Sequence, residues 1–193
     1  MITDALAARF QDPTNSLMLT CKGRLINPLD PQEVDTEEIA HVLSRFRRYG
    51  GHTPISWTVG QHVILCAHLA YLKTGDEAVA LQALHHDDQE AIIGDWPKPI
   101  KNRIPGLKEI EDEVEAKVRT LLGLPTEFDP VVKEVDLWAL EIESYFLWAG
   151  QLDDGAEYAE TVRDLAALTD DEVKTLLIAE DKRLRALVTQ NAK

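Results

Sequence analysis

The chain has 193 residues, of which 45% are hydrophobic, and its formal net charge is −14 at pH 7. This length and composition are typical of a globular protein with one core, so we expect residues 1–193 to form a single domain. The charge argues against a nucleic-acid polymer as partner, because such binding needs clustered Lys and Arg at the phosphates, but it permits a small anion at a locally basic site.

The first element expected along the chain is a short irregular or hairpin segment over residues 11–34, where prolines interrupt β-prone residues. Helical periodicity and capping residues predict about seven helices after it, so the expected fold class is all-α. These helices span about residues 35–50, 59–72, 77–93, 107–123 and 129–148, and two more begin near residues 156 and 169. The expected N-terminal caps include Asp35, Asp129 and Thr169. Between the third and fourth helices, Pro97 and Pro99 predict a stiff extended loop from Asp95 to Lys101, because proline fixes φ and removes a backbone donor.

Several groups that can bind a metal ion lie at the end of the third helix. His86 and Asp87 are adjacent, and Glu90 and Asp95 follow them. On a helix, His86 and Glu90 would share one face that continues an apolar stripe, with Asp87 at its edge. Histidine and carboxylate together suit manganese, cobalt, iron or zinc, and a bound cation generates a nucleophile from water near neutral pH. A solvated polar helix end is the alternative explanation.

Two further candidate ligands come from other helices. His62 lies beside the apolar stripe of the second helix, where His68 is its competitor. Asp136 falls on the core side of the fifth helix, where a carboxylate is costly unless it is paired or binds a metal. Each has an ordinary explanation, since a core histidine can bond a backbone carbonyl and a core aspartate can pair with an arginine. With the pair at the end of the third helix, they predict one interior site shared by three helices.

The combined spacing of these residues closely resembles that of the HD-domain metal-dependent phosphohydrolases, and most of all the branch of bacterial 5′-deoxynucleotidases and phage dATP triphosphohydrolases. The residues that carry the resemblance are His62, His86-Asp87, Asp136, Glu90 and the segment Gly94-Asp95-x-Pro97-x-Pro99-x-Lys101. The resemblance covers roughly residues 20–150 and leaves residues 151–193, the expected C-terminal helices, without a motif. It implies an HD-type helical bundle with a metal at its centre.

The family pattern implies a role for each of these residues. Its metal ligands correspond here to His62, His86, Asp87 and Asp136. They would hold a divalent cation (Co²⁺, Mn²⁺, Mg²⁺ or Zn²⁺) and leave coordination positions for water and a substrate phosphate. Glu90 and Asp95 would orient or deprotonate the attacking water and help the leaving oxygen to depart.

A basic segment before the second helix extends the resemblance to the substrate. Arg48-Tyr49-Gly50-Gly51-His52-Thr53 is similar to the Arg-aromatic-x-Gly-His-Thr segment of this branch, in which the Arg reaches the phosphate and the aromatic ring packs near the sugar. The guanidinium fork suits phosphate because it binds bidentately. Arg45 and Arg47 are explained by the helix dipole alone. By the same resemblance, Lys101 would be a second phosphate contact and Pro99 a rigid wall near the base.

The chain departs from the family pattern at two positions. Tyr49 stands where the bacterial nucleotidases carry Trp, which leaves the preference for deoxyribose over ribose undecided. Asp88 follows the His-Asp pair where relatives usually place a small residue. Its carboxylate could face solvent or support a second metal.

These residues predict an enzyme that hydrolyses deoxynucleotides at the 5′ phosphate ester. The products would be a deoxynucleoside with either phosphate, from a dNMP, or triphosphate, from a dNTP and especially dATP. One alternative is a nucleotide phosphodiesterase, which the scarcity of further histidines near the motif disfavours. Another is a non-catalytic nucleotide-binding protein, which the presence of both Glu90 and Asp95 disfavours.

Cellular context and partners are predicted from simpler features. Cys21 and Cys66 are too few for a disulfide framework and indicate free thiols in a reducing compartment. Neither a secretion signal nor a membrane span is expected, so we predict a bacterial cytoplasmic protein, with phage origin as an alternative, and no membrane partner. Aromatic residues of the fifth helix exceed what one face would bury, which indicates an interface and predicts a homo-oligomer (dimer or larger), with a well-buried core helix as the alternative explanation. These aromatic residues are Trp138, Tyr145, Phe146 and Trp148.

Overall fold

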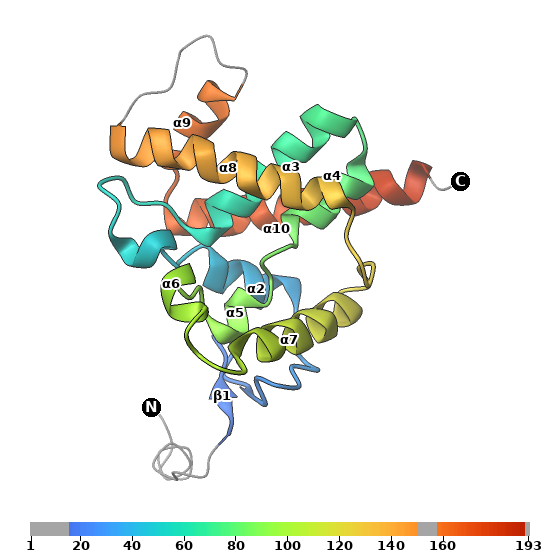
Figure 1. Cartoon of the computed structure of the whole chain (residues 1–193). Helices are drawn as coiled ribbons and strands as arrows, with labels where there is room; N and C mark the ends of the chain where they lie inside the picture. Colours follow the sequence, from blue (N-terminus) through green and yellow to red (C-terminus); the bar gives the residue numbers. More distant parts are fainter. Residues whose placement is uncertain (1–15, 150–157, 192–193) are drawn as a thin grey trace.

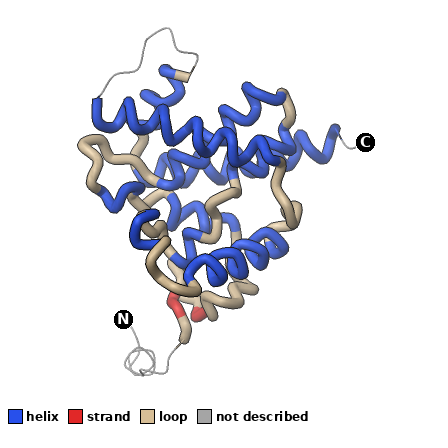
Figure 2. The backbone as a smooth tube through the Cα atoms, in the orientation of Figure 1, coloured by secondary structure: helices blue, strands red, loops and turns tan. Residues whose placement is uncertain are grey.

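The computed structural model describes residues 16–149 and 158–191, and this part of the chain is built almost entirely from helices (Figures 1 and 2). Its elements are β1 (Met18–Leu19), β2 (Leu25–Ile26), α2 (Thr36–Leu43), the short 3-10 helix η1 (Arg48–Gly51), α3 (Val59–Thr74), α4 (Glu77–Leu84), α5 (Glu90–Ile93), α6 (Lys98–Lys101), α7 (Leu107–Leu121), α8 (Pro130–Ala149), α9 (Ala159–Ala167) and α10 (Asp170–Asn191). The all-α prediction is confirmed, with nine α-helices in the described residues instead of about seven.

Local sequence signals account for where the elements begin. β1 and β2 form the expected hairpin, with Met18 opposite Ile26 and Gly23 at φ 77° in its turn. All three expected caps are present. At the start of α2, the Asp35 side chain accepts a hydrogen bond from the Glu38 backbone N–H. At α8, the Asp129 side chain accepts from the Val131 backbone N–H. At α10, the Thr169 hydroxyl accepts from the Glu172 backbone N–H, and the Glu172 carboxylate accepts from the Thr169 backbone N–H.

Helix α3 is the centre of the core. It packs against α2, α4, α8, α9 and α10, and its residues from Val59 to Ala67 are all buried. Gly60 lets α10 approach closely, because a Cβ at that position would lie 2.8 Å from Val173 Cγ1 and 3.2 Å from the Leu43 carbonyl oxygen. α8 and α10 each pack against both α3 and α4 (Figure 1), so the side chains that α3 turns toward α8 are enclosed.

Two predicted elements differ from the structure. The helix expected over residues 77–93 is broken, since α4 ends at Leu84, a turn occupies residues 85–89, and α5 begins at Glu90. The expectation of an extended chain up to Lys101 is also wrong, because α6 forms one helical turn there. Proline is tolerated in a first helical turn, where its missing N–H would have no partner. The helix start predicted near residue 156 lies outside the described residues.

A buried ionic network holds the turn after α4 against α10. His85 Nδ1 lies 2.7 Å from Asp88 Oδ2, and His85 Nε2 lies 2.8 Å from Asp181 Oδ1, which also accepts from Arg185 Nε. Burial disfavours the imidazolium, but the two carboxylates outweigh it and raise the pKa of His85 to about 9. Asp88 is therefore buried in this network and does not face solvent.

The aromatic side chains of α8 divide between the core and the surface. Phe146 is 9% exposed and Trp138 packs edge-on against Tyr158, whereas Tyr145 and Trp148 are 69% and 50% exposed. Oligomerisation stays a prediction. Within the described ranges, no helix combines the length and apolar character needed to cross a bilayer.

We predict that Asp181→Ala lowers the free energy of unfolding by roughly 1.5–3 kcal/mol, the range for a hydrogen bond to a charged group, because His85 and Arg185 lose their shared acceptor. Chemical denaturation followed by circular dichroism measures the change. Asp171→Ala is the matched control on the same helix, since its carboxylate is 84% exposed and its pairing with Arg45 contributes less than about 1 kcal/mol. Equal effects of the two variants would contradict this account of the turn.

Candidate metal centre and phosphate site

His62 stands at the centre of the candidate site. It lies in the second turn of α3 and its side chain has no solvent exposure. His62 Nδ1 is 2.6 Å from Glu143 Oε1, and because a carboxylate can only accept, Nδ1 carries the proton. Nε2 faces the carboxylates of Asp87, at 3.6 Å, and Asp136, at 3.3 Å, where it can bind either a proton or a metal ion.

His86 approaches the same point from the turn after α4. Its Nδ1 lies 2.8 Å from the Ala83 carbonyl oxygen, which fixes the proton on Nδ1. His86 Nε2 is buried and has no hydrogen-bond partner, although it lies 3.3 Å from Asp87 Oδ2 and 3.9 Å from Asp136 Oδ1. Buried polar atoms normally have a hydrogen-bond partner, so a buried nitrogen lone pair that accepts no hydrogen bond is a candidate metal ligand.

The structure thus brings all four predicted ligands together, although His86 and Asp87 come from a turn and not from the expected helix. Two imidazole nitrogens and two carboxylates suit a divalent cation of intermediate hardness. Burial opposes a positive charge on His62, yet the negative groups around it, Glu143 and Asp136 among them, hold its pKa well above the usual value. Burial likewise disfavours the Asp136 anion, but its hydrogen bond with His62 and nearby histidines hold its pKa far below the usual range. The residues present therefore fit a cation at this point.

The carboxylate of Glu143, on α8, links the metal ligands to the substrate side of the site. It is fully buried and accepts from four donors in the described structure. These donors are Arg48 Nε at 3.1 Å, Tyr49 Oη at 2.7 Å, Trp57 Nε1 at 3.0 Å and His62 Nδ1 at 2.6 Å. Burial alone would raise the pKa of Glu143, but His62 and Arg48 lower it to about 2. We did not predict this residue from the sequence. It lies seven residues after Asp136, about two turns further along the same face of α8.

Arg48 and Tyr49 are held in the short helix η1. Tyr49 has a φ of 56°, the only positive value among the non-glycine residues described, and strain of this kind is found at functional sites. The Arg48 guanidinium bonds Glu143 through Nε, and its NH1 atom lies 3.9 Å from Asp87 Oδ2. Burial works against its charge, but Glu143 and Asp87 raise the pKa of Arg48, so it is a permanent cation beside the metal ligands.

The two neighbouring arginines are directed elsewhere. Arg47 pairs with Asp170 and Arg45 with Asp171, both in the first turn of α10. The structure thus singles out Arg48 among the three arginines of this segment. The ion pairs of Arg45 and Arg47 also connect this segment to α10, which the helix dipole alone does not explain.

Glu90 and Asp95 supply further carboxylates around the ligands. Glu90 Oε2 is buried without a hydrogen-bond partner. Burial and the charges of Asp87 and Asp95 raise the pKa of Glu90 well above its usual value. The pKa of Asp95 is also raised, mainly by burial and against the opposing charge of Arg48.

The remaining predicted substrate contacts lie on α6. Lys101 Nζ pairs with Glu111 Oε1 at 2.6 Å, and its charge acts on Asp95. Pro99 is exposed at the surface of the same turn. Lys101 is therefore near the carboxylates but already has an anionic partner, whereas the contacts of Arg48 all lie within the site.

Comparison with known proteins gives one family and two similar proteins. The sequence model of the family described as "5'-deoxynucleotidase YfbR-like" matches residues 56–142, which include His62, Glu90 and Asp136. The chain is 34% identical over 128 residues to the uncharacterized protein YfdR of Escherichia coli, a match that covers 66% of this chain and 67% of that protein. It is also 34% identical over 118 residues to an uncharacterized protein of Rhodobacter capsulatus, which covers 58% of this chain and 60% of that relative.

We predict that Glu143→Gln weakens Mn²⁺ binding at least about tenfold, the range found for partners of metal-binding histidines. All four contacts of this carboxylate are donors, so the amide NH₂ of glutamine would face donors and His62 would lose its fixed orientation. Calorimetric titration of the metal-stripped protein measures the affinity. Glu141→Gln, the same change at an exposed position of α8, is the control and should bind as the unmodified protein does. Unchanged affinity in folded Glu143→Gln would refute the orienting role.

Proposed function

We propose that this chain, which belongs to the YfbR-like 5'-deoxynucleotidase family of HD-domain phosphohydrolases, hydrolyses deoxynucleotides at the 5′ phosphate ester in a metal-dependent reaction. One observation carries the proposal. The Nε2 atoms of His62 and His86 meet the carboxylates of Asp87 and Asp136 directly beside the Arg48 guanidinium. A cation site next to a permanent positive charge is suited to phosphate.

The metal site would be formed by the four converging ligands, and a divalent cation held there supplies Lewis acidity toward the phosphoryl group and acidifies water. Turnover measured with Co²⁺, Mn²⁺, Mg²⁺ and Zn²⁺ would identify the metal ion that the reaction uses. The chain's own contribution is orientation, because the proton on each histidine Nδ1 is fixed by Glu143 or by the Ala83 carbonyl.

Arg48 would bind the substrate phosphate. Its Nε is occupied by Glu143, which locks the guanidinium plane and leaves the terminal nitrogens on the side of Asp87. The side chain is only 13% exposed, so its charge acts through little water. Tyr49, fixed through its hydroxyl by the same carboxylate, places an aromatic ring next to this phosphate contact, where the sugar would lie. Lys101 and Pro99 would border the substrate on the α6 side.

Glu90 would accept the proton of the attacking water at Oε2, the buried oxygen that has no other partner. Water adds to phosphorus, the bond from phosphorus to the 5′ oxygen breaks, and that oxygen takes up a proton, which Asp95 would help to deliver. The products are a deoxynucleoside and phosphate. We propose dNMPs as the substrates, since the family is described as a 5'-deoxynucleotidase family.

Turnover by metal-stripped protein tests the proposal. The protein is resupplied with Co²⁺, Mn²⁺, Mg²⁺ or Zn²⁺ and given dNMPs, dNTPs and ribonucleotides, and the products are separated by chromatography. We expect deoxynucleoside and phosphate from dNMPs. Deoxynucleoside and triphosphate from dNTPs would instead identify a dNTP triphosphohydrolase. No turnover with any pair of metal ion and nucleotide would refute the proposed reaction.

We further predict that Glu90→Gln lowers kcat at least about 100-fold, because an amide cannot accept the water proton. Metal and nucleotide affinities should stay within about threefold, since Glu90 is not one of the four ligands and its Oε2 has no hydrogen-bond partner. Glu109→Gln, at an exposed position of α7, is the control and should keep full turnover. Unchanged kcat in Glu90→Gln would remove this residue from the mechanism.

A further inference from the structure

Trp148 packs against Tyr49 at the edge of the site, and the reaction proposed above gives it no role. The centroid of its ring lies 5.0 Å from that of Tyr49, and the two ring planes meet at 79°. An edge-to-face pair at this distance is a favourable aromatic contact. Trp148 is also 50% exposed, so its position is not explained by burial in the core. Its ring reaches Tyr49 from the surface of the protein.

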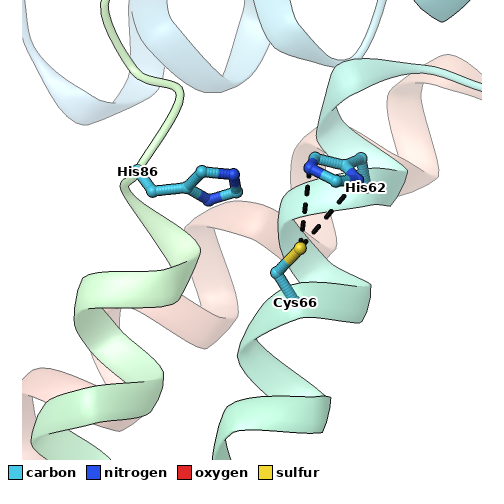
Figure 3. Close-up of side chains that lie close together, drawn as sticks. All are labelled: His62, Cys66 and His86. Carbon is cyan, nitrogen blue, oxygen red and sulfur yellow. Dashed lines mark hydrogen bonds between the residues drawn. The ribbon is translucent and has the colours of Figure 1, made fainter. Parts of the chain in front are cut away.

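The carboxylate of Glu143 has one oxygen toward the metal ligands and the other toward Tyr49. Oε1 is 2.6 Å from Nδ1 of His62, whose ring lies across from that of His86 (Figure 3), with 5.2 Å between the two centroids. Oε2 accepts from the Tyr49 hydroxyl at 2.7 Å and from Arg48 Nε at 3.1 Å. The central carbon of the Arg48 guanidinium is 5.4 Å from the tyrosine ring centroid. Tyr49 therefore lies beside the candidate phosphate contact.

The conformation of Tyr49 needs support from its neighbours. Its φ of 56° and ψ of 25° lie in the left-handed region, which non-glycine residues adopt rarely and keep only where surrounding contacts fix them. The hydroxyl bond to Glu143 fixes the far end of the side chain. It does not fix the ring plane, because the hydroxyl oxygen lies on the axis about which the ring rotates. An edge-on neighbour such as Trp148 restricts that rotation.

One helix carries both groups that hold Tyr49. Glu143 and Trp148 lie five residues apart on α8, about one and a half turns, and the same helix supplies Asp136. α8 packs against α3 and α4 in the core, whereas Tyr49 lies in the short helix η1. A long, packed helix positions side chains more precisely than a short connecting segment does. α8 thus sets the Tyr49 ring relative to the metal ligands.

We propose that Trp148 is a positioning residue for the nucleoside part of the substrate and acts through the ring of Tyr49. The inference rests on the proposed function, in which this ring lies next to the sugar. When its plane is already fixed, the ring loses little freedom on binding, and the affinity for the nucleoside is higher. Phosphate is bound by Arg48 and the metal ion, so its affinity does not depend on Trp148.

Kinetics of Trp148→Ala test this division. We expect the KM for dNMPs to rise about three- to tenfold, the range for loss of an edge-to-face aromatic pair, while kcat stays within about threefold. The Kd for Mn²⁺ and the inhibition constant of inorganic phosphate should also stay within about threefold. Trp148→Phe keeps a ring and should recover most of the lost affinity. Tyr145→Ala removes an aromatic side chain of α8 that is 69% exposed, and as the matched control it should leave the KM unchanged.

Three results would overturn the proposal and leave the proposed reaction intact. The first is equal loss of affinity for dNMPs and inorganic phosphate in Trp148→Ala. The second is a Trp148→Phe protein no better than Trp148→Ala. The third is an unchanged KM, and if sedimentation then showed dissociation into smaller species, Trp148 would belong to a subunit interface. No turnover by the unmodified protein would instead refute both the proposed function and this inference.

The ring contact can also be tested in the unmodified protein without substrate. The chain has four tyrosines, so NMR of protein labelled with ¹³C in the tyrosine rings gives few signals, and Tyr49→Phe identifies that of Tyr49. We expect nuclear Overhauser effects between the ring protons of Tyr49 and those of Trp148. Their absence would overturn the proposal even if Trp148→Ala failed to fold, whatever reaction the protein catalyses.

Discussion

The carboxylate of Glu143 is the interaction on which the rest of the site depends. An ionised carboxylate removed from water costs several kcal/mol unless donors surround it, and here four donors do so. One of them is His62, whose other nitrogen is a candidate metal ligand, and another is Arg48, the candidate phosphate contact. A single buried group thus sets the orientation of both the imidazole and the guanidinium, and their spacing cannot change without leaving a charge unpaired.

The break in the helix after Leu84 has an equally specific consequence. On a continuous helix, neighbouring residues point about 100° apart, so His86 and Asp87 could not both turn toward one ion. The turn over residues 85–89 removes this restriction, and the buried contacts of His85 with Asp88 and Asp181 keep it in place. The C-terminal helix α10, which carries no motif of its own, therefore stabilises the metal ligands from a distance.

Much of the fold and most of the site could be predicted from the sequence. Helix starts were readable where a cap such as Asp35 preceded an apolar repeat, and the spacing of His62, His86 and Asp136 was enough to group them. The broken helix was not readable, because its break is stabilised by Asp181, almost a hundred residues later. Glu143 was missed for a similar reason, since its donors come from distant segments and periodicity alone does not distinguish a buried carboxylate from a surface one.

Anomalous diffraction would show directly whether His62, His86, Asp87 and Asp136 hold one divalent cation. Crystals grown with Mn²⁺ would be measured at the manganese absorption edge. We expect the strongest anomalous peak between His62 Nε2 and His86 Nε2, in contact with the carboxylates of the two aspartates. A strongest peak elsewhere on this acidic chain, with His86 Nε2 bonded to another protein group, would contradict it.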